Sequence, residues 1–351
     1  MASFLDRITT FVGTLASGPT LQPKSVVIKP ERCKPDGCTG VTIAKDECYL
    51  RLTINELFLA DARRAFVEYQ PMVVSAISYI QGNEPITVPS VVGPSLLSRP
   101  TVELPQSLLL NDIDIAGPLP YRGGNITISL VLYRVRHTNY ARDLLNVVEG
   151  VSKAIGPAAD LGMLSKISGA LLDGVESLLG LGDTEPVMGH RFTMSPVGPG
   201  GMKSFYAALV PSKSTTDDLS VDSGRLRIGD GAVPRPYSES DYILYNLSTH
   251  ARRTDVSTLP FFGMYERAKR DAFRGGKESW AAAKATFSEV WQQMMTSPDL
   301  IPQQAEELFI EWKQALLAEK TRGDNFLAMS TTKSETEASA GIRRAAELLN
   351  L

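Results

Sequence analysis

The sequence predicts an α+β protein in which an antiparallel, β-sandwich-like domain with an inserted helical hairpin is followed by a C-terminal helical module. Runs that alternate between polar and apolar residues lie on both sides of a central segment, residues 139–181. That segment, and the chain after Phe261, instead carry apolar residues every three or four positions. A period of two is typical of strands and a period near 3.6 is typical of helices, so the two patterns together predict the mixed class.

The composition is that of a globular protein without an excess of positive charge. Hydrophobic residues make up 43% of the 351 residues, which is enough to bury a full core and excludes a mostly disordered or fibrous chain. Lys and Arg number 36 against 39 Asp and Glu, giving a net charge of -3. Nucleic acid is therefore not an expected partner, because binding to a phosphate backbone depends on a surplus of positive charge.

The length predicts more than one domain, since about 150 residues is typical of a single one. We expect an N-terminal amphipathic helix at residues 1–20 and a β-sandwich-like domain at residues 21–260. Its helical insertion is expected at about residues 139–182, and the C-terminal α-helical module at residues 261–351.

The N-terminal segment predicts a helix rather than a targeting signal. Asp6 and Arg7 interrupt the apolar run that a signal peptide requires. No uncharged stretch of the chain reaches the roughly 18 to 20 apolar residues of a membrane-spanning helix. The expected location is cytoplasmic. The apolar face of the helix comprises Phe4, Leu5, Ile8, Phe11, Val12 and Leu15.

Strands are predicted before and after the central segment. Residues 49–54 and 126–135 alternate clearly, and residues 72–80 are rich in β-branched and aromatic side chains without a charge. The prolines from Pro85 to Pro105 are expected to leave short edge strands and loops. Further strands are expected at residues 190–194, 205–210, 225–228 and 242–247.

The central segment predicts a helical hairpin. Asn139 is a suitable N-cap, and Pro157 divides the segment into two helices. Residues 147–182 hold 7 glycines and 6 charged residues, an unusual composition that would allow the hairpin to change conformation. We expect it to pack over the sheet, with membrane insertion or self-association as the alternative. Its apolar stripe comprises Leu164, Ile167, Leu171, Val175 and Leu178.

The chain after Phe261 predicts helices that carry every tryptophan of the protein. Trp280 and Trp291 share a face with Phe287 and Met294, while a helix beginning at Pro302 carries Trp312 on the same side as Leu308 and Leu316. A last helix is expected around residues 338–349. Core packing is favoured for each tryptophan taken singly, and any that are exposed are the candidate partner-binding residues.

The cysteines predict reduced thiols and no metal site. The chain has three, Cys33, Cys38 and Cys48, and an odd number cannot all pair within one chain. A structural zinc site needs four Cys or His ligands, and no histidine precedes His137. Zinc completed by distant residues stays open as an alternative, and no cofactor is expected.

No catalytic set is recognisable. Residues 195–204 resemble a phosphate-binding loop, but Met202 separates the glycines from Lys203, so we expect a turn. Residues 221–224 have the Asp-Ser-Gly order of an aspartic protease in one copy with polar flanks, which also predicts a turn.

The histidines and a cluster of basic residues give no clear site. His190 and His250 have no metal-type spacing, and a hydrolase would need one histidine beside a Ser, Cys or carboxylate in a cleft. Arg134 and Arg136 precede His137 at the end of a strand. We expect these charges to face water, with a small anion-binding patch as the alternative.

These observations favour a non-enzymatic interaction protein, a subunit or adaptor of a larger intracellular assembly. No catalytic set is present, whereas two amphipathic helical regions are available as docking faces. Protein partners are expected, and homo-oligomerisation stays open. One alternative is a membrane-active or self-associating effector that uses residues 147–182, although their polar face is not basic and would attract anionic lipid weakly. The other is a hydrolase whose site is assembled from residues distant in sequence.

Overall fold

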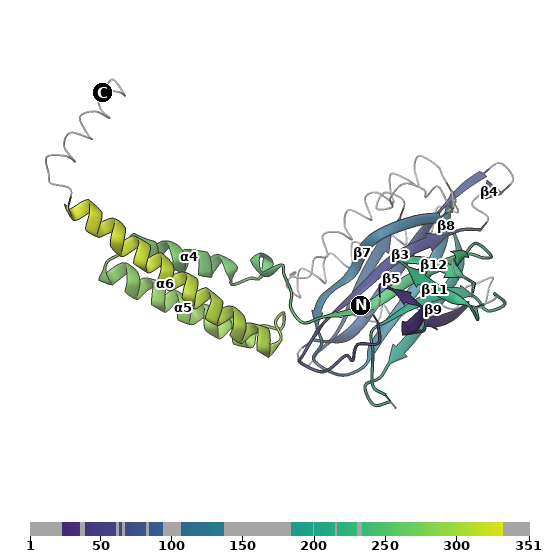
Figure 1. The fold of residues 1–351 in the computed structure, drawn as a ribbon, viewed down its shortest axis with the longest axis horizontal. Coiled ribbons are helices and arrows are strands. Elements are labelled where there is room, and N and C mark those ends of the chain that lie inside the picture. The colour runs from purple at the N-terminus through teal and green to yellow at the C-terminus, as the bar shows by residue number, and fades with distance from the viewer. Residues whose placement is uncertain are drawn as a thin grey trace, which may run out of the picture. The chain divides into compact units, whose positions relative to one another are not determined.

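The computed structural model describes residues 23–35, 39–60, 63–64, 67–81, 84–93, 107–136, 184–198, 200–214, 216–229 and 234–332 (Figure 1). These residues form a mixed α+β protein whose sheets are mostly antiparallel, which confirms the predicted class.

The first five-stranded sheet has the strand order β1-β10-β14-β3-β7, and all of its neighbouring strands are antiparallel. The strands predicted at residues 49–54, 205–210 and 242–247 all lie within it. The sheet comprises β1 (Pro23–Ile28), β3 (Tyr49–Phe58), β7 (Ser107–Pro120), β10 (Phe205–Pro211) and β14 (Tyr242–His250).

The second five-stranded sheet has the order β4-β5-β8-β9, with β6 also paired with β5. Pro85 and Pro89 lie in β6, which is an edge strand in the described residues, as expected for a strand that lacks two N–H donors. The sheet comprises β4 (Arg63–Arg64), β5 (Val67–Gln81), β6 (Glu84–Val92), β8 (Ile126–Arg136) and β9 (Thr184–Met194).

A small four-stranded sheet has the order β13-β12-β11-β2. Its strands β11 and β12 are joined at Ser223 and Gly224, which have positive φ angles of 52° and 74°. The turn predicted at residues 221–224 is thus found at its last two residues, while Asp222 ends β11. The sheet comprises β2 (Cys33–Lys34), β11 (Leu219–Asp222), β12 (Arg225–Ile228) and β13 (Arg235–Pro236), and a 3-10 helix, η1 (Pro30–Arg32), precedes β2.

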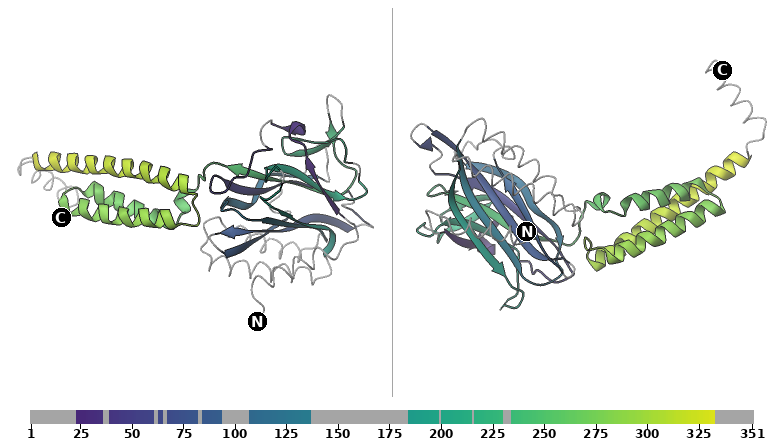
Figure 2. Two further views of the ribbon diagram at one scale, coloured as in Figure 1. Left: turned by 90° about the horizontal axis from the view of Figure 1, so that it is seen from below. Right: turned by 180° about the vertical axis from the view of Figure 1, so that it is seen from behind.

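The two five-stranded sheets bury one hydrophobic core (Figure 2). The alternation that predicted the strands also predicts which side chains enter this core, because every second residue of a strand faces the same way. From β3 and β8 these are Leu50, Leu52, Ile54, Ile126, Ile128, Leu130 and Leu132.

Strand β7 was not predicted from the sequence. Asp112 and Asp114 break its alternation, and its pairing with β3 is irregular at three places. Gly117 lies where the two strands approach closely: its φ is 119°, and a Cβ there would lie 2.5 Å from the carbonyl oxygen of Leu50. Glycine is therefore required at this crossing.

The end of β8 corrects one expectation. Arg134 does not face water: it is only 5% exposed, and its guanidinium forms an ion pair of 3.0 Å with Asp241. The buried partner lies 107 positions away in the sequence, so the basic cluster alone gave no sign of it. Arg136 is exposed, as expected.

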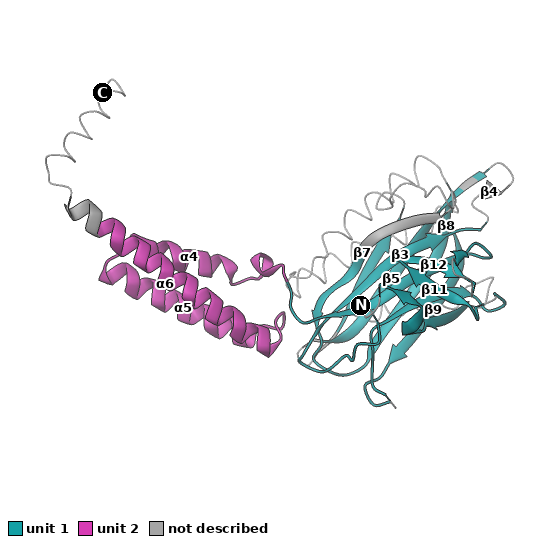
Figure 3. Cartoon of the chain, viewed as in Figure 1, with its two compact units in different colours: residues 1–253 teal, residues 254–351 magenta. Residues whose placement is uncertain are grey.

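The chain divides into two compact units between Arg253 and Thr254 (Figure 3). We call residues 1–253 the β unit and residues 254–351 the helical unit. In the described part of the helical unit, buried side chains of all three helices form one core. The elements are η3 (Val256–Thr258), α4 (Phe262–Arg274), α5 (Lys277–Thr296) and α6 (Pro302–Thr332).

Several predicted features lie outside the described residues. These are the N-terminal helix at 1–20, the hairpin at about 139–182 with its stripe Leu164, Ile167, Leu171, Val175 and Leu178, the last helix at 338–349, and Cys38 and His137. Within the part of the chain that the structure describes, no helix has the length and apolar character needed to cross a membrane.

Candidate functional site

Trp312 is a core residue of the helical unit. It is 4% exposed, and its ring stacks on that of Tyr265 with the centroids 4.1 Å apart and the planes 11° from parallel. Phe261 and Phe262 also contact it edge-on. Burial and the nearby carboxylates raise the pKa of Tyr265 to about 12. Trp312 therefore joins α4 to α6 and is not available as a surface anchor.

Trp280 is only partly buried, and two ammonium groups lie over its ring. The Nζ of Lys284 is 5.9 Å from the ring centroid, and the Nζ of Lys320, which comes from α6, is 5.5 Å from it. Such cation–π contacts stabilise by roughly 0.5–1 kcal/mol each at exposed sites. Lys320 also pairs with Asp324 at 2.8 Å, whereas Lys284 has no ion pair in the described part of the chain.

Trp291 is also partly exposed, and its ring packs against aromatic residues of the core. Its ring lies 4.2 Å from that of Phe309 on α6, and Phe309 in turn stacks on the buried ring of Phe287 at 5.1 Å. Trp291 thus continues the aromatic core outward. The exposed side chain of Met295 lies one turn further along α5.

These contacts define one surface, which we call the α5–α6 surface. Along α5 its residues are spaced by four and seven positions, which places them on one helix face. The contacts of Trp280 with Lys320 and of Trp291 with Phe309 join that face to α6. The α5–α6 surface comprises Trp280, Lys284, Trp291, Phe309 and Lys320. Its tryptophans were identified from the sequence, whereas the other three residues were missed, although Lys284 shares the helical spacing.

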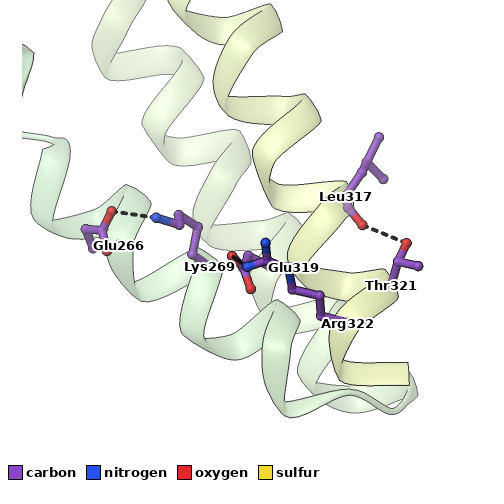
Figure 4. Close-up of polar contacts among 6 residues, drawn as sticks. All are labelled: Glu266, Lys269, Leu317, Glu319, Thr321 and Arg322. Carbon is purple, nitrogen blue, oxygen red and sulfur yellow. Dashed lines mark hydrogen bonds and ion pairs between the residues drawn. The ribbon is translucent and has the colours of Figure 1, made fainter. Parts of the chain in front are cut away.

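Several other charged side chains of the helical unit pair with a neighbour on the same helix (Figure 4). Lys269 pairs with Glu266 at 3.0 Å in α4, and Arg322 pairs with Glu319 at 2.9 Å in α6. The hydroxyl of Thr321 donates to the carbonyl of Leu317 one turn earlier. Local pairs of this kind contribute a few tenths of a kcal/mol and satisfy their own charges, so they offer little to a partner.

His250 and Ser248 form a polar contact on the first sheet. The Nε2 of His250 is 3.3 Å from the Oγ of Ser248, two residues earlier on β14. Arg51 and Asp114, from β3 and β7, form an ion pair of 3.4 Å, and both influence the pKa of His250. Burial and the Arg51 charge lower that pKa. The cluster links the neighbouring strands β14, β3 and β7. A hydrolase that uses one of the histidines stays a prediction.

Two buried cysteines make local hydrogen bonds. The thiol of Cys33 donates to the carbonyl of Lys29, and the thiol of Cys48 donates to the carbonyl of Ala44. Each sulfur–oxygen distance is 3.5 Å. Burial raises the pKa of the Cys48 thiol, which disfavours the thiolate that metals bind. Among the described residues, no group of three or more His, Cys, Asp or Glu side chains could hold a metal ion.

The α5–α6 surface thus places two partly exposed indole rings beside the ammonium groups of Lys284 and Lys320. No protein-family model, curated protein or solved structure matches this chain.

Proposed function

We propose that this chain is a non-enzymatic interaction protein, a subunit or adaptor of a larger intracellular assembly, which docks a protein partner on the α5–α6 surface. One observation carries the proposal: Trp280 and Trp291 both keep part of their rings exposed on a surface that also presents Lys284 and Lys320.

The chemistry of this surface suits a protein partner. Tryptophan is enriched among the residues that dominate binding energy, because a large rigid ring buries much apolar area at a low cost in conformational entropy. Trp280 and Trp291 are held in place by Lys320 and Phe309, so a partner would meet preformed rings. Preorganisation of this kind improves affinity, since fewer side chains must be ordered on binding.

The charges indicate what the partner presents. Lys284 has no ion pair in the described residues, and its Nζ lies over the Trp280 ring, 5.9 Å from the centroid. An acidic side chain of the partner would pair with it, next to apolar side chains that cover Trp291. In this proposal the two five-stranded sheets are a sandwich-like scaffold, and the partner is either another protein or a second copy of this chain.

The test compares two full-length variants. Trp280→Ala/Trp291→Ala removes both rings, while Phe326→Ala removes a ring that is 64% exposed elsewhere on α6. Light scattering after size-exclusion chromatography reports self-association, and affinity capture from a lysate of the source cells reports other partners. Circular dichroism checks that each variant is folded.

We expect the wild type and Phe326→Ala to form the same complex, and the double tryptophan variant to lose it. A wild type that stays monomeric and captures no protein would contradict the proposal. So would a double variant that retains the same complex at the same yield.

A further inference from the structure

A pocket of about 430 Å³ lies in the β unit where β1, β9, β10 and β14 meet. Its wall is aromatic: Phe192, Phe205 and Tyr245 line it, and their ring centroids are 6.0–6.2 Å apart. Sites for small molecules have volumes of roughly 300–1,000 Å³ and mainly apolar linings with a few polar groups. The pocket therefore has the size and character of a ligand site.

The strand register explains how the Tyr245 ring comes to line the pocket. Ala207 lies in register between Val27 on β1 and Tyr245 on β14. The small side chain of Ala207 leaves room for the Tyr245 ring to cross β10. The hydroxyl of Tyr245 lies 2.9 Å from the hydroxyl of Ser25 on β1, and both residues line the pocket.

The polar groups of the pocket favour an anion. Lys203 lines it, is exposed, and has no ion pair in the described part of the chain, and no carboxylate lines the pocket. Burial lowers the pKa of His190, which stacks on Phe192 at 5.6 Å, so this ring is neutral near pH 7. Burial raises the pKa of Tyr245, so its hydroxyl stays protonated. Lys203 is thus the charged residue among those that line the pocket.

We propose that this pocket binds a small aromatic carboxylate. The flat ring of the ligand packs against Phe192 and Phe205, where offset or edge-on ring contacts are favourable. Its carboxylate pairs with the ammonium of Lys203. The pocket shares no residue with the α5–α6 surface, so this proposal does not depend on the proposed docking function.

Calorimetric titration of the full chain with 2-naphthoate tests the site. Lys203→Gln removes the charge, and Lys213→Gln, at an exposed lysine that does not line the pocket, is its control. Val27→Trp narrows the pocket at a side chain that is already 59% exposed, so the fold should tolerate it. The neutral alcohol 2-naphthalenemethanol serves as the uncharged probe.

We expect saturable binding of 2-naphthoate that Lys203→Gln weakens about fivefold, the effect of one partly exposed charge pair. Val27→Trp should weaken both probes, Lys213→Gln neither, and the alcohol should bind the wild type and Lys203→Gln equally. The proposal is overturned if the wild type shows no saturable binding below about 5 mM. It is also overturned if either Lys203→Gln or Val27→Trp leaves 2-naphthoate binding unchanged while circular dichroism shows a folded protein.

Discussion

The guanidinium of Arg134 and the carboxylate of Asp241 form a buried ion pair, with 3.0 Å between Nη2 and Oδ2. Arg134 lies on β8 of the second sheet, and Asp241 directly precedes β14 of the first. The other carboxylate oxygen of Asp241 accepts the backbone N–H of Ala60 at 2.6 Å. One carboxylate thus connects a strand of one sheet, the start of a strand of the other, and the loop after β3.

Loss of one member of this pair should strongly destabilise the β unit. Arg134→Met removes a charged partner of the buried Asp241 carboxylate, and breaking a buried ion pair in this way costs about 3–5 kcal/mol. Arg136→Met, two residues on at an exposed position, should cost less than about 0.5 kcal/mol. Urea unfolding followed by circular dichroism measures both. Equal free energies of unfolding for the two variants would show that the buried pair does not stabilise the β unit.

Replacing either of two glycines in the helical unit with alanine should change its stability, but in opposite directions. At Gly323 in α6 an added Cβ would overlap the carbonyl oxygen of Phe273, so Gly323→Ala should cost about 1–3 kcal/mol despite its better helix propensity. At Gly263 in α4 the Cβ would meet nothing within 4 Å, so Gly263→Ala should stabilise by up to about 1 kcal/mol. Thermal unfolding of both variants supplies the measurement. A stabilising Gly323→Ala would refute the close approach of α4 and α6.

Replacement of Trp312 should destabilise the helical unit more than replacement of Trp280. Trp312→Ala removes a ring that is 4% exposed and stacked on Tyr265, which should cost about 3–5 kcal/mol. Trp280→Ala removes a partly exposed ring and should cost less than about 1.5 kcal/mol. The free energy of unfolding of the helical unit, measured for both variants by denaturant titration, distinguishes them. If Trp280→Ala proved as costly as Trp312→Ala, Trp280 would be a core residue and not a docking residue.

Stability should fall as the pH drops below neutrality. Burial lowers the pKa of His190 and His250 below the ordinary value of 6.5, so under mildly acidic conditions the unfolded chain binds protons that the folded chain does not. The free energy of unfolding should therefore decrease from about pH 7.5 towards pH 5.5. Replacing both histidines with glutamine should make this dependence shallower. An unchanged slope would mean that neither ring titrates differently on folding.

The sequence predicted those elements whose side-chain pattern follows one period. The alternation at residues 126–135 and the helical spacing around Trp291 both correspond to observed elements, β8 and α5. Strand β7 was missed because acidic residues and its crossing at Gly117 interrupt the alternation.

Contacts between distant residues could not be predicted in the same way. The partner of Arg134 is 107 positions away, and the pocket lined by Tyr245 draws on four strands. The tryptophans of the α5–α6 surface were identified by residue type alone. Their exposure depends on how α5 and α6 pack, so the sequence did not separate Trp312 from the other two.

The central claim is that a partner covers the α5–α6 surface, and hydroxyl-radical footprinting tests it most directly. Oxidation of individual side chains is compared between the free protein and the complex isolated from the source cells, with Phe326 as an internal reference because it is exposed elsewhere on α6. The account predicts that oxidation of Trp280 and Trp291 falls several-fold in the complex while that of Phe326 does not change. Equal oxidation of both tryptophans in the free and assembled protein would contradict it.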